Sequence, residues 1–435
     1  MHPIRSALAF SLATLALAGL ATAQQSSDKE IFLQFAHKYA DANGCSEFDL
    51  AYTPDGHLIA AFVEERLTFD DRLIVAELDP VTGAWLKLVD SPFYMERITG
   101  ISLAVPTHKY GDPKYDRWYC SVIFSNPSSS GGAPDDVWVG IVSGLYGKVW
   151  GPWITFCEKL PHVTATGISL QSALACVPLG PSDWSNGYAL ELVFSYFDDP
   201  TSKGYSVWRA TSLDQAHSFA SETLIAGANA QGSGTLRGAG NFWHPTVAAD
   251  ERNAYLLVAF EDVKAQNVLI ASGAIGSSLS LIDQTPANDG RPEFAPCLAV
   301  DDTDVNLTCR AGSIGTSGEG LLAWYVGTTF GGFLQLPTIH ARATSAGDIA
   351  VHEGGAYIAA TVLPDNNGAS RCFAFEGDRD SLTATLTATA IQDSGSANGS
   401  PRVAITPEGV TPFRRSYAWR VPPTATKPRG VWLDL

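Results

Sequence analysis

Charged side chains recur at one position of a repeat in this sequence, and their types are those used in acid–base chemistry. Asp348 and Arg402 come from the last two repeats and Asp49 from the first. If the repeats close into a ring, these three are neighbours, and two carboxylates flank one guanidinium. Two carboxylates that face a sugar can share the roles of general acid and of base or nucleophile. The same cluster is also typical of a structural ion pair, because buried charges are usually paired. Both interpretations remain open from the sequence.

A second group of polar residues lies just before the strands that carry this position, where side chains can meet solvent and ligand. The further candidate catalytic carboxylates are Glu47 and Glu293, and the candidate substrate-binding residues are Arg402, His244, Trp243, Arg97 and Arg291. Trp243 offers an aromatic face that suits the apolar face of a sugar ring, or else it packs between neighbouring sheets.

The elements that position these residues are strands that repeat about every 50 residues. Short segments such as Ser102-Leu-Ala-Val and Cys297-Leu-Ala-Val share one frame, and a more hydrophobic segment follows each of them. We place the central residue of these segments at positions 51, 104, 171, 248, 299, 350 and 404. The residues two positions earlier then share one height: Asp49, Ser102, Ser169, Thr246, Cys297, Asp348 and Arg402.

A period of about 50 residues is the length of one four-stranded propeller blade. The spacing predicts an all-β fold, a single β-propeller of seven four-stranded blades, with six blades as the alternative. The two longest spacings place inserted loops in the second and third blades. We expect a ligand on the axis, at the face where the innermost strands begin.

The last repeat is one strand short, and an early segment has no repeat of its own. The chain ends at Gly430-Val-Trp-Leu-Asp-Leu435, whereas Glu30–Ala36 is an apolar segment before the first blade. We therefore expect an N-terminal strand to complete the last blade, which ties the termini together and removes a sheet edge.

One turn resembles a motif of known propellers. Residues 212–219 read Ser-Leu-Asp-Gln-Ala-His-Ser-Phe and follow a strand of β-branched and aromatic residues. This turn resembles the Asp-box (BNR repeat) of sialidase-like β-propellers, in which Asp and Ser side chains bond backbone amides inside the turn. More degenerate copies begin at Asp79, Ser143 and Ser272. The resemblance implies a sialidase-like propeller scaffold, in which these turns are structural.

The resemblance also implies which catalytic groups to look for. True sialidases use an arginine triad, a Tyr/Glu pair, an acid–base Asp and an early Phe/Tyr-Arg-Ile-Pro motif. The nearest segment here is Arg97-Ile98-Thr99, which has Thr in place of Pro and lies in the second blade. We find no arginine triad, so fold alone does not indicate sialidase activity.

Composition and the N-terminus limit the partners and the location. Residues 1–23 read as a secretory signal peptide with Ala21-Thr22-Ala23 at its cleavage site, which leaves 24–435 as one propeller domain of a secreted protein, extracellular or periplasmic. The net charge of −17 argues against binding to nucleic acid or to anionic membranes. Seven cysteines lack metal-site spacing, and Cys297 with Cys309 is the best candidate disulfide. We expect a monomer with no cofactor and no bound metal.

Two classes of function fit this sequence. In the first, the protein is a glycoside hydrolase with Asp49, Asp348, Glu293 and Glu47 as candidate catalytic residues. In the second, it is a non-catalytic propeller that binds a glycan or another extracellular protein. In both, the expected ligand is a carbohydrate or glycoconjugate.

Overall fold

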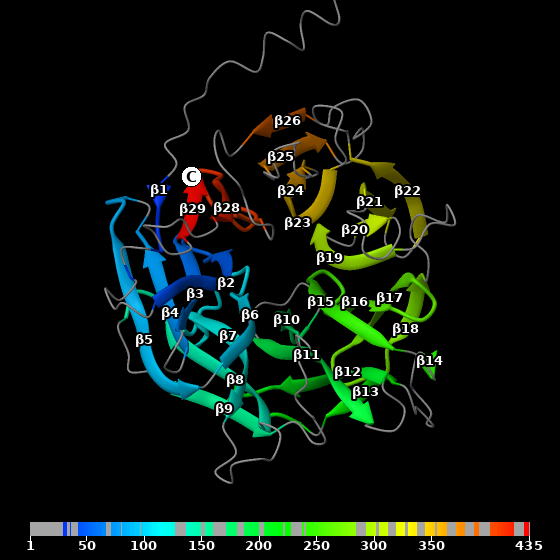
Figure 1. Ribbon diagram of the computed structural model, residues 1–435, viewed down its shortest axis with the longest axis horizontal. Helices are drawn as coiled ribbons and strands as arrows, with labels where there is room; N and C mark the ends of the chain where they lie inside the picture. The colour runs from blue at the N-terminus through cyan, green and yellow to red at the C-terminus, as the bar shows by residue number, and fades with distance from the viewer. Residues whose placement is uncertain are drawn as a thin grey trace, which may run out of the picture.

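The computed structural model of the chain is a ring of sheets around a central axis (Figure 1). It describes residues 29–32, 35, 42–66, 71–79, 81–95, 97–126, 136–148, 153–159, 171–180, 187–199, 204–220, 222–227, 237–238, 241–283, 293–301, 304–311, 319–326, 329–336, 344–352, 355–362, 371–378, 387–390, 401–421 and 430–434. The described strands form seven sheets, which match the seven repeats. The predicted all-β propeller is therefore confirmed.

The sheets follow one another along the chain as blades 1 to 7. Blade 1 contains β2 (Ala42–Tyr52), β3 (Leu58–Arg66), β4 (Asp71–Leu78) and β5 (Trp85–Met95). Blade 2 contains β6 (Arg97–Ala104), β7 (Arg117–Asn126), β8 (Asp136–Leu145) and β9 (Trp153–Lys159), with the short helix η1 (Pro113–Tyr115) between β6 and β7. Blade 3 contains β10 (Ser172–Pro178), β11 (Tyr188–Asp199), β12 (Gly204–Ser212), β13 (Thr223–Gly227) and β14 (Arg237–Gly238).

The second half of the ring has the same order. Blade 4 contains β15 (Phe242–Asp250), β16 (Tyr255–Asp262), β17 (Asn267–Ala274) and β18 (Ser280–Asp283). Blade 5 contains β19 (Glu293–Asp301), β20 (Asp304–Ala311), β21 (Glu319–Val326) and β22 (Thr329–Gln335). Blade 6 contains β23 (Thr344–His352), β24 (Gly355–Val362), β25 (Arg371–Asp378) and β26 (Thr387–Ala390), and blade 7 contains β27 (Arg402–Ile405), β28 (Arg415–Val421), β29 (Gly430–Asp434) and β1 (Lys29–Glu30).

The N-terminal strand closes blade 7, as the sequence predicts. Strand β1 pairs antiparallel with β29, and Lys29 lies opposite Leu433. The pairing uses residues 29–31, because the Ile31 amide donates to the carbonyl of Val431 at 2.9 Å. Figure 1 shows the blue β1 beside the red β29.

Each blade packs its sheet faces against its neighbours, so the core is a series of apolar layers between blades. The layer between blades 7 and 1, for example, joins Phe48 and Phe62 to Leu433, and all three are buried. This arrangement explains why the second strands are apolar on both faces, as in Ile59–Val63, where every residue is fully buried. Within the described residues, no helix is long and apolar enough to cross a membrane.

The register of blade 3 differs from the sequence alignment. Leu174-Ala175 of β10 occupies the frame of Leu103-Ala104, because the amides of Leu174 and Leu103 each bond to a side chain of the preceding blade. The alanine at the centre of this repeat is therefore Ala175, and the repeat alignment that placed Gln171 there was wrong. Ser169, which was aligned with Asp49, lies outside the described residues.

Candidate functional site

The innermost strand of each blade pairs with one neighbour only, so its other edge faces the axis. Backbone groups on that edge need partners, and side chains of the adjacent blade supply several of them. The carboxylate of Asp49 accepts a hydrogen bond from the amide of Leu103 at 2.7 Å, and the hydroxyl of Ser102 accepts from that of Leu174 at 3.2 Å. Thr246 repeats the contact with the amide of Leu298 at 3.4 Å. We call these residues and their equivalents the axial ring.

Asp348 holds the same position between blades 6 and 7. Its Oδ2 accepts from the amide of Val403 at 3.0 Å, and its Oδ1 accepts from its own neighbour Ile349 at 3.0 Å. The thiol of Cys297, from blade 5, donates to the same Oδ1 at 2.9 Å. Cys297 is a free thiol, so the expected disulfide with Cys309 is not formed.

Arg402 is the equivalent residue of blade 7, and it faces blade 1. Its Nε lies 3.7 Å from Oδ1 of Asp49, and the two side chains are 30% and 20% exposed. Asp49 also accepts from the amide of Leu50 at 2.9 Å. The structure therefore brings Asp49 and Arg402 together, with Asp348 bonded to the residue after Arg402.

The axial ring follows a simple rule. An acceptor side chain bonds the amide of the next blade, as Asp49, Ser102, Thr246 and Asp348 do. Two ring residues, Cys297 and Arg402, are donors, and each faces an aspartate of the next blade. That aspartate also accepts a hydrogen bond from the amide of the residue that follows it in the chain. Ala173 holds the seventh position and has no polar side chain. These contacts give Asp49 and Asp348 a structural role; a catalytic role for them stays a prediction.

The ionisation of Asp49 reflects this setting. Burial raises the pKa of Asp49 from its ordinary 3.8 to about 6, against the opposing effects of Arg402 and of the two amide bonds. Burial likewise raises the pKa of Glu47, while Arg402 and Arg420 oppose the change. The Arg420 guanidinium donates to the carbonyl of Ser46, next to Glu47.

The residues expected at the face where the innermost strands begin are engaged between blades. His244 Nδ1 lies 2.8 Å from Oε2 of Glu261, and the same oxygen accepts from the amide of Ala295 in the next blade at 3.3 Å. His244 and Ala295 both have positive φ, 48° and 47°, and each precedes a proline in a β-bulge. Sequence analysis missed Glu261, although the repeated spacing of Pro245 and Pro296 marks both bulges.

The remaining candidates at this face have separate surroundings. The ring centroids of Trp243 and Tyr205, in blade 3, lie 5.0 Å apart in an edge-on arrangement. Trp243 therefore packs between neighbouring sheets, which is one of the two roles that the sequence suggests. Glu293 is 1% exposed, and its carboxylate accepts from the amide of Val268 at 3.4 Å. Arg97 is exposed at the start of β6, and Arg291 lies outside the described residues.

A cavity of about 570 Å³ lies on the axis at the other ends of the innermost strands. The expectation of a ligand site where these strands begin therefore does not match the position of this cavity. All seven innermost strands line it, through residues 50–52, 103–104, 174–176, 248–249, 298–301, 349–352 and 403–405. These segments begin one residue after the axial ring, or two in blade 4, so the ring lies beside one end of the cavity.

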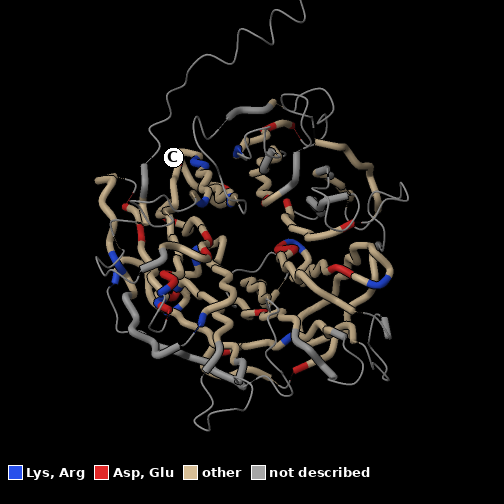
Figure 2. The backbone as a smooth tube through the Cα atoms, in the orientation of Figure 1, with Lys and Arg blue, Asp and Glu red and all other residues tan. Residues whose placement is uncertain are grey.

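Polar side chains form the rim of this axial cavity. They come from the last residue of an innermost strand or from the connection after it, two to four residues beyond the alanine at the centre of each repeat: Thr107, His108, Glu251, Arg252, Asp301, His352 and Glu408. Figure 2 shows acidic and basic residues side by side on the connection between β15 and β16, which faces the axis. The ring of His352 stacks on Phe413 at 4.7 Å. Sequence analysis missed this group, but the same repeat alignment, read further along each repeat, would have found it.

The predicted turn at Ser212 has the expected internal bonds. Ser212 Oγ accepts from the amide of Ala216 at 2.9 Å, and Asp214 accepts from the amide of Ser218 at 2.8 Å. The turn lies on the end of blade 3 and contributes no side chain to the axial cavity. Within the described residues, no group of three or more His, Cys, Asp or Glu side chains is placed to hold a metal ion.

Comparisons with known proteins found matches among solved structures. No family model matches the chain, and no curated protein matches it. Among solved structures, a protein of unknown function from Dyadobacter fermentans shares 12% identity, with a TM-score of 0.48, over 78% of this chain and 94% of the other. The phage phi92 endosialidase shares 13% (TM-score 0.48; 94% and 68%). Trypanosoma rangeli sialidase, solved with the inhibitor DANA, shares 9% (TM-score 0.45; 93% and 59%).

The axial ring predicts a graded loss of stability. Asp348→Ala removes the acceptor of two amides and a thiol, so we expect the free energy of unfolding to fall by roughly 3 kcal/mol, because bonds to charged groups are the strong ones. Ser102→Ala removes one neutral bond and should cost about 1 kcal/mol. Urea denaturation measures both. Equal, negligible losses would contradict the structural role of the ring.

The raised pKa of Asp49 predicts a pH dependence of stability. Because the folded pKa of about 6 lies above the ordinary 3.8, the folded state holds the proton between these values while the unfolded state has lost it. The contribution of Asp49 to stability is therefore full below pH 4 and declines as pH rises to about 6, by roughly 3 kcal/mol in total. Asp49→Asn should remove this decline in unfolding curves measured from pH 4 to 7. A wild-type-minus-variant difference that is constant with pH would refute the assignment.

Proposed function

We propose that the protein is a carbohydrate-directed propeller that binds a sugar residue or the end of a glycan in the axial cavity. The observation that carries this proposal is the composition of the cavity wall, which consists of the unpaired edges of seven innermost strands. The carbonyl groups of such edges, and the amides that the axial ring does not bond, can meet a ligand without adding net charge. Sugar hydroxyls both donate and accept, and therefore match a wall of this kind.

The size and charge of the cavity support the same ligand class. A volume of about 570 Å³ falls in the range of small-ligand sites, roughly 300–1,000 Å³. Its rim combines Glu251, Asp301 and Glu408 with Arg252 and two histidines, so its charge is net acidic and disfavours an anionic ligand. The stacked rings of His352 and Phe413 supply an aromatic surface close to the rim.

Hydrolysis is the second candidate function, and one observation favours it. The pKa of Asp49, raised to about 6 by burial, approaches the range of a general acid that works near neutral pH. Against this, the carboxylates of Asp49 and Asp348 already accept backbone hydrogen bonds. We therefore propose binding as the main function and treat hydrolysis as an outcome of the test.

A glycan array probed with the purified protein tests the proposal. We expect one related class of neutral glycans to bind, with His352→Ala weakening binding about tenfold, or 1.4 kcal/mol. Lys148→Ala, on an exposed turn outside the cavity, is the control and should bind like the wild type. Release of reducing sugar from a bound glycan, abolished in Asp49→Asn, would establish hydrolysis instead. No binding to any neutral glycan would contradict the proposal.

We also propose that the protein is exported, on the basis of residues 1–23. Their basic start, apolar segment and small-residue site at Ala21-Thr22-Ala23 have the pattern of a cleaved signal peptide. N-terminal sequencing of the exported protein should find a start at Gln24. Recovery of the uncleaved chain in the cytosol would refute export.

A further inference from the structure

The connection between β6 and β7 lies across the mouth of the axial cavity. It runs over residues 105–116 and contains η1, whereas the equivalent connections of blades 1 and 4 occupy only residues 53–57 and 251–254. We call residues 105–116 the strap. Thr107 and His108 of the strap line the cavity directly.

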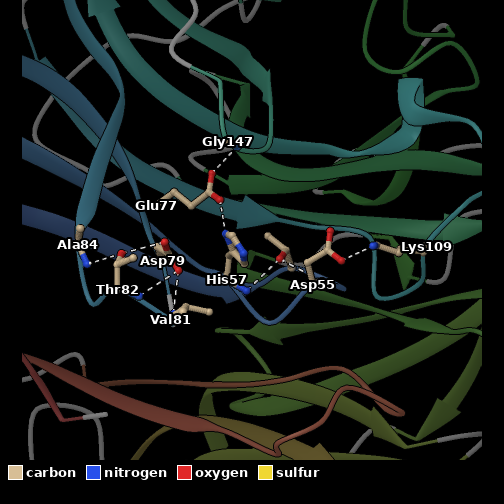
Figure 3. Close-up of polar contacts among 10 residues, drawn as sticks. Asp55, His57, Glu77, Asp79, Val81, Thr82, Ala84, Lys109 and Gly147 are labelled. Carbon is tan, nitrogen blue, oxygen red and sulfur yellow. Dashed lines mark hydrogen bonds and ion pairs between the residues drawn. The ribbon is translucent and has the colours of Figure 1, made fainter.

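The body of the strap is fixed to the blades on both sides of blade 2. The ammonium group of Lys109 pairs with Asp55 on the connection between β2 and β3 of blade 1, as Figure 3 shows. The same view shows Glu77 of blade 1 between His57 and the amide of Gly147, which ties blades 1 and 2 together at this face.

An aromatic cluster holds the other side of the strap. The rings of Tyr110 and Tyr115 lie 5.1 Å and 5.4 Å from that of Tyr188 in blade 3. Tyr188 is buried, and its hydroxyl donates to the carbonyl of Tyr115 at 3.3 Å. The body of the strap is therefore anchored, and the part before Lys109 lies outside these anchors.

The tip of the strap reaches past blade 3 to blade 4. His108 Nδ1 lies 3.0 Å from Oε2 of Glu251, and the hydroxyl of Thr107 donates to Oε1 of the same carboxylate. His108 and Glu251 are 29% and 23% exposed. Ion pairs exposed to this degree contribute little to stability, so this contact can open without unfolding a blade. All three residues line the cavity, so their contact narrows its mouth.

We propose that the tip of the strap, Thr107 and His108, is a gate over the axial cavity and that Glu251 is its catch. Release of Glu251 widens the mouth on the side of blade 3 and frees a carboxylate at the rim. Ligand entry and exit then depend on how often this contact opens. The inference rests on the proposed binding site for its purpose, but the gate itself can be tested without a ligand.

A free cysteine under the strap reports on the gate. Cys176 of β10 lines the cavity and is buried. Burial raises the pKa of this thiol, and the Glu251 carboxylate raises it further, which places Cys176 near the catch. A reagent in solution must therefore pass the mouth of the cavity to reach this sulfur.

The test is the rate at which iodoacetamide alkylates Cys176 in the folded protein, followed by peptide mapping. In the variant Thr107→Val/His108→Phe, valine keeps the shape of threonine, phenylalanine keeps an aromatic ring of somewhat larger size, and both lose their polar contacts with Glu251. It leaves the Glu251 carboxylate in place, so the change does not remove the charge that raises the pKa of Cys176. We expect alkylation to be at least fivefold faster than in the wild type, with an unchanged melting temperature.

The matched control is His352→Phe, the same change at another histidine of the rim, whose ring stacks on Phe413. Iodoacetamide should alkylate Cys176 in this variant within twofold of the wild-type rate. An unchanged rate in the double variant would overturn the gate, and so would an equal acceleration in both variants. Gating without glycan binding would leave the gate standing and defeat only the proposed function.

Discussion

The structure depends on how seven innermost strands satisfy the edge that faces the axis. Each of these strands has a partner on one side only, and a row of bare amides in the centre of a protein is costly. The axial ring meets this constraint with side chains from the preceding blade, so the bonds that satisfy the edge also join one blade to the next. Asp49, Ser102, Thr246 and Asp348 each make such a link.

The charges of the ring follow from the same constraint. A buried aspartate needs hydrogen bonds or a cation, and here each aspartate has amides and a donor from the preceding blade. Arg402 serves Asp49, and the thiol of Cys297 serves Asp348. The link between blades 3 and 4 lacks this contact, because Ala173 has no acceptor. Farther out, Trp243 packs on Tyr205 between the same two blades.

Sequence periodicity was sufficient to predict the ring of blades, its closure by β1 and the meeting of Asp49 with Arg402. A small residue at the centre of each repeat and a fixed repeat length follow from the propeller geometry, and both can be read from a single sequence. The register of blade 3 was wrong, since Thr166-Gly-Ile-Ser resembles Thr99-Gly-Ile-Ser but Ala175 takes the place of Ala104. The cavity was missed for another reason: strand edges form its wall, and their backbone groups leave no pattern of residue types in the sequence.

The closure of blade 7 has a consequence for the order of folding. Ile31, Phe32 and Phe35 pack in a layer with Phe62 of blade 1 and Leu433 of β29. A ribosome makes Leu433 about 400 residues after Ile31, so this layer cannot form before residue 433 has been made. Until then the blades form an open arc, with apolar faces uncovered at both of its ends. Those uncovered faces are surfaces through which an incomplete ring can associate with another chain.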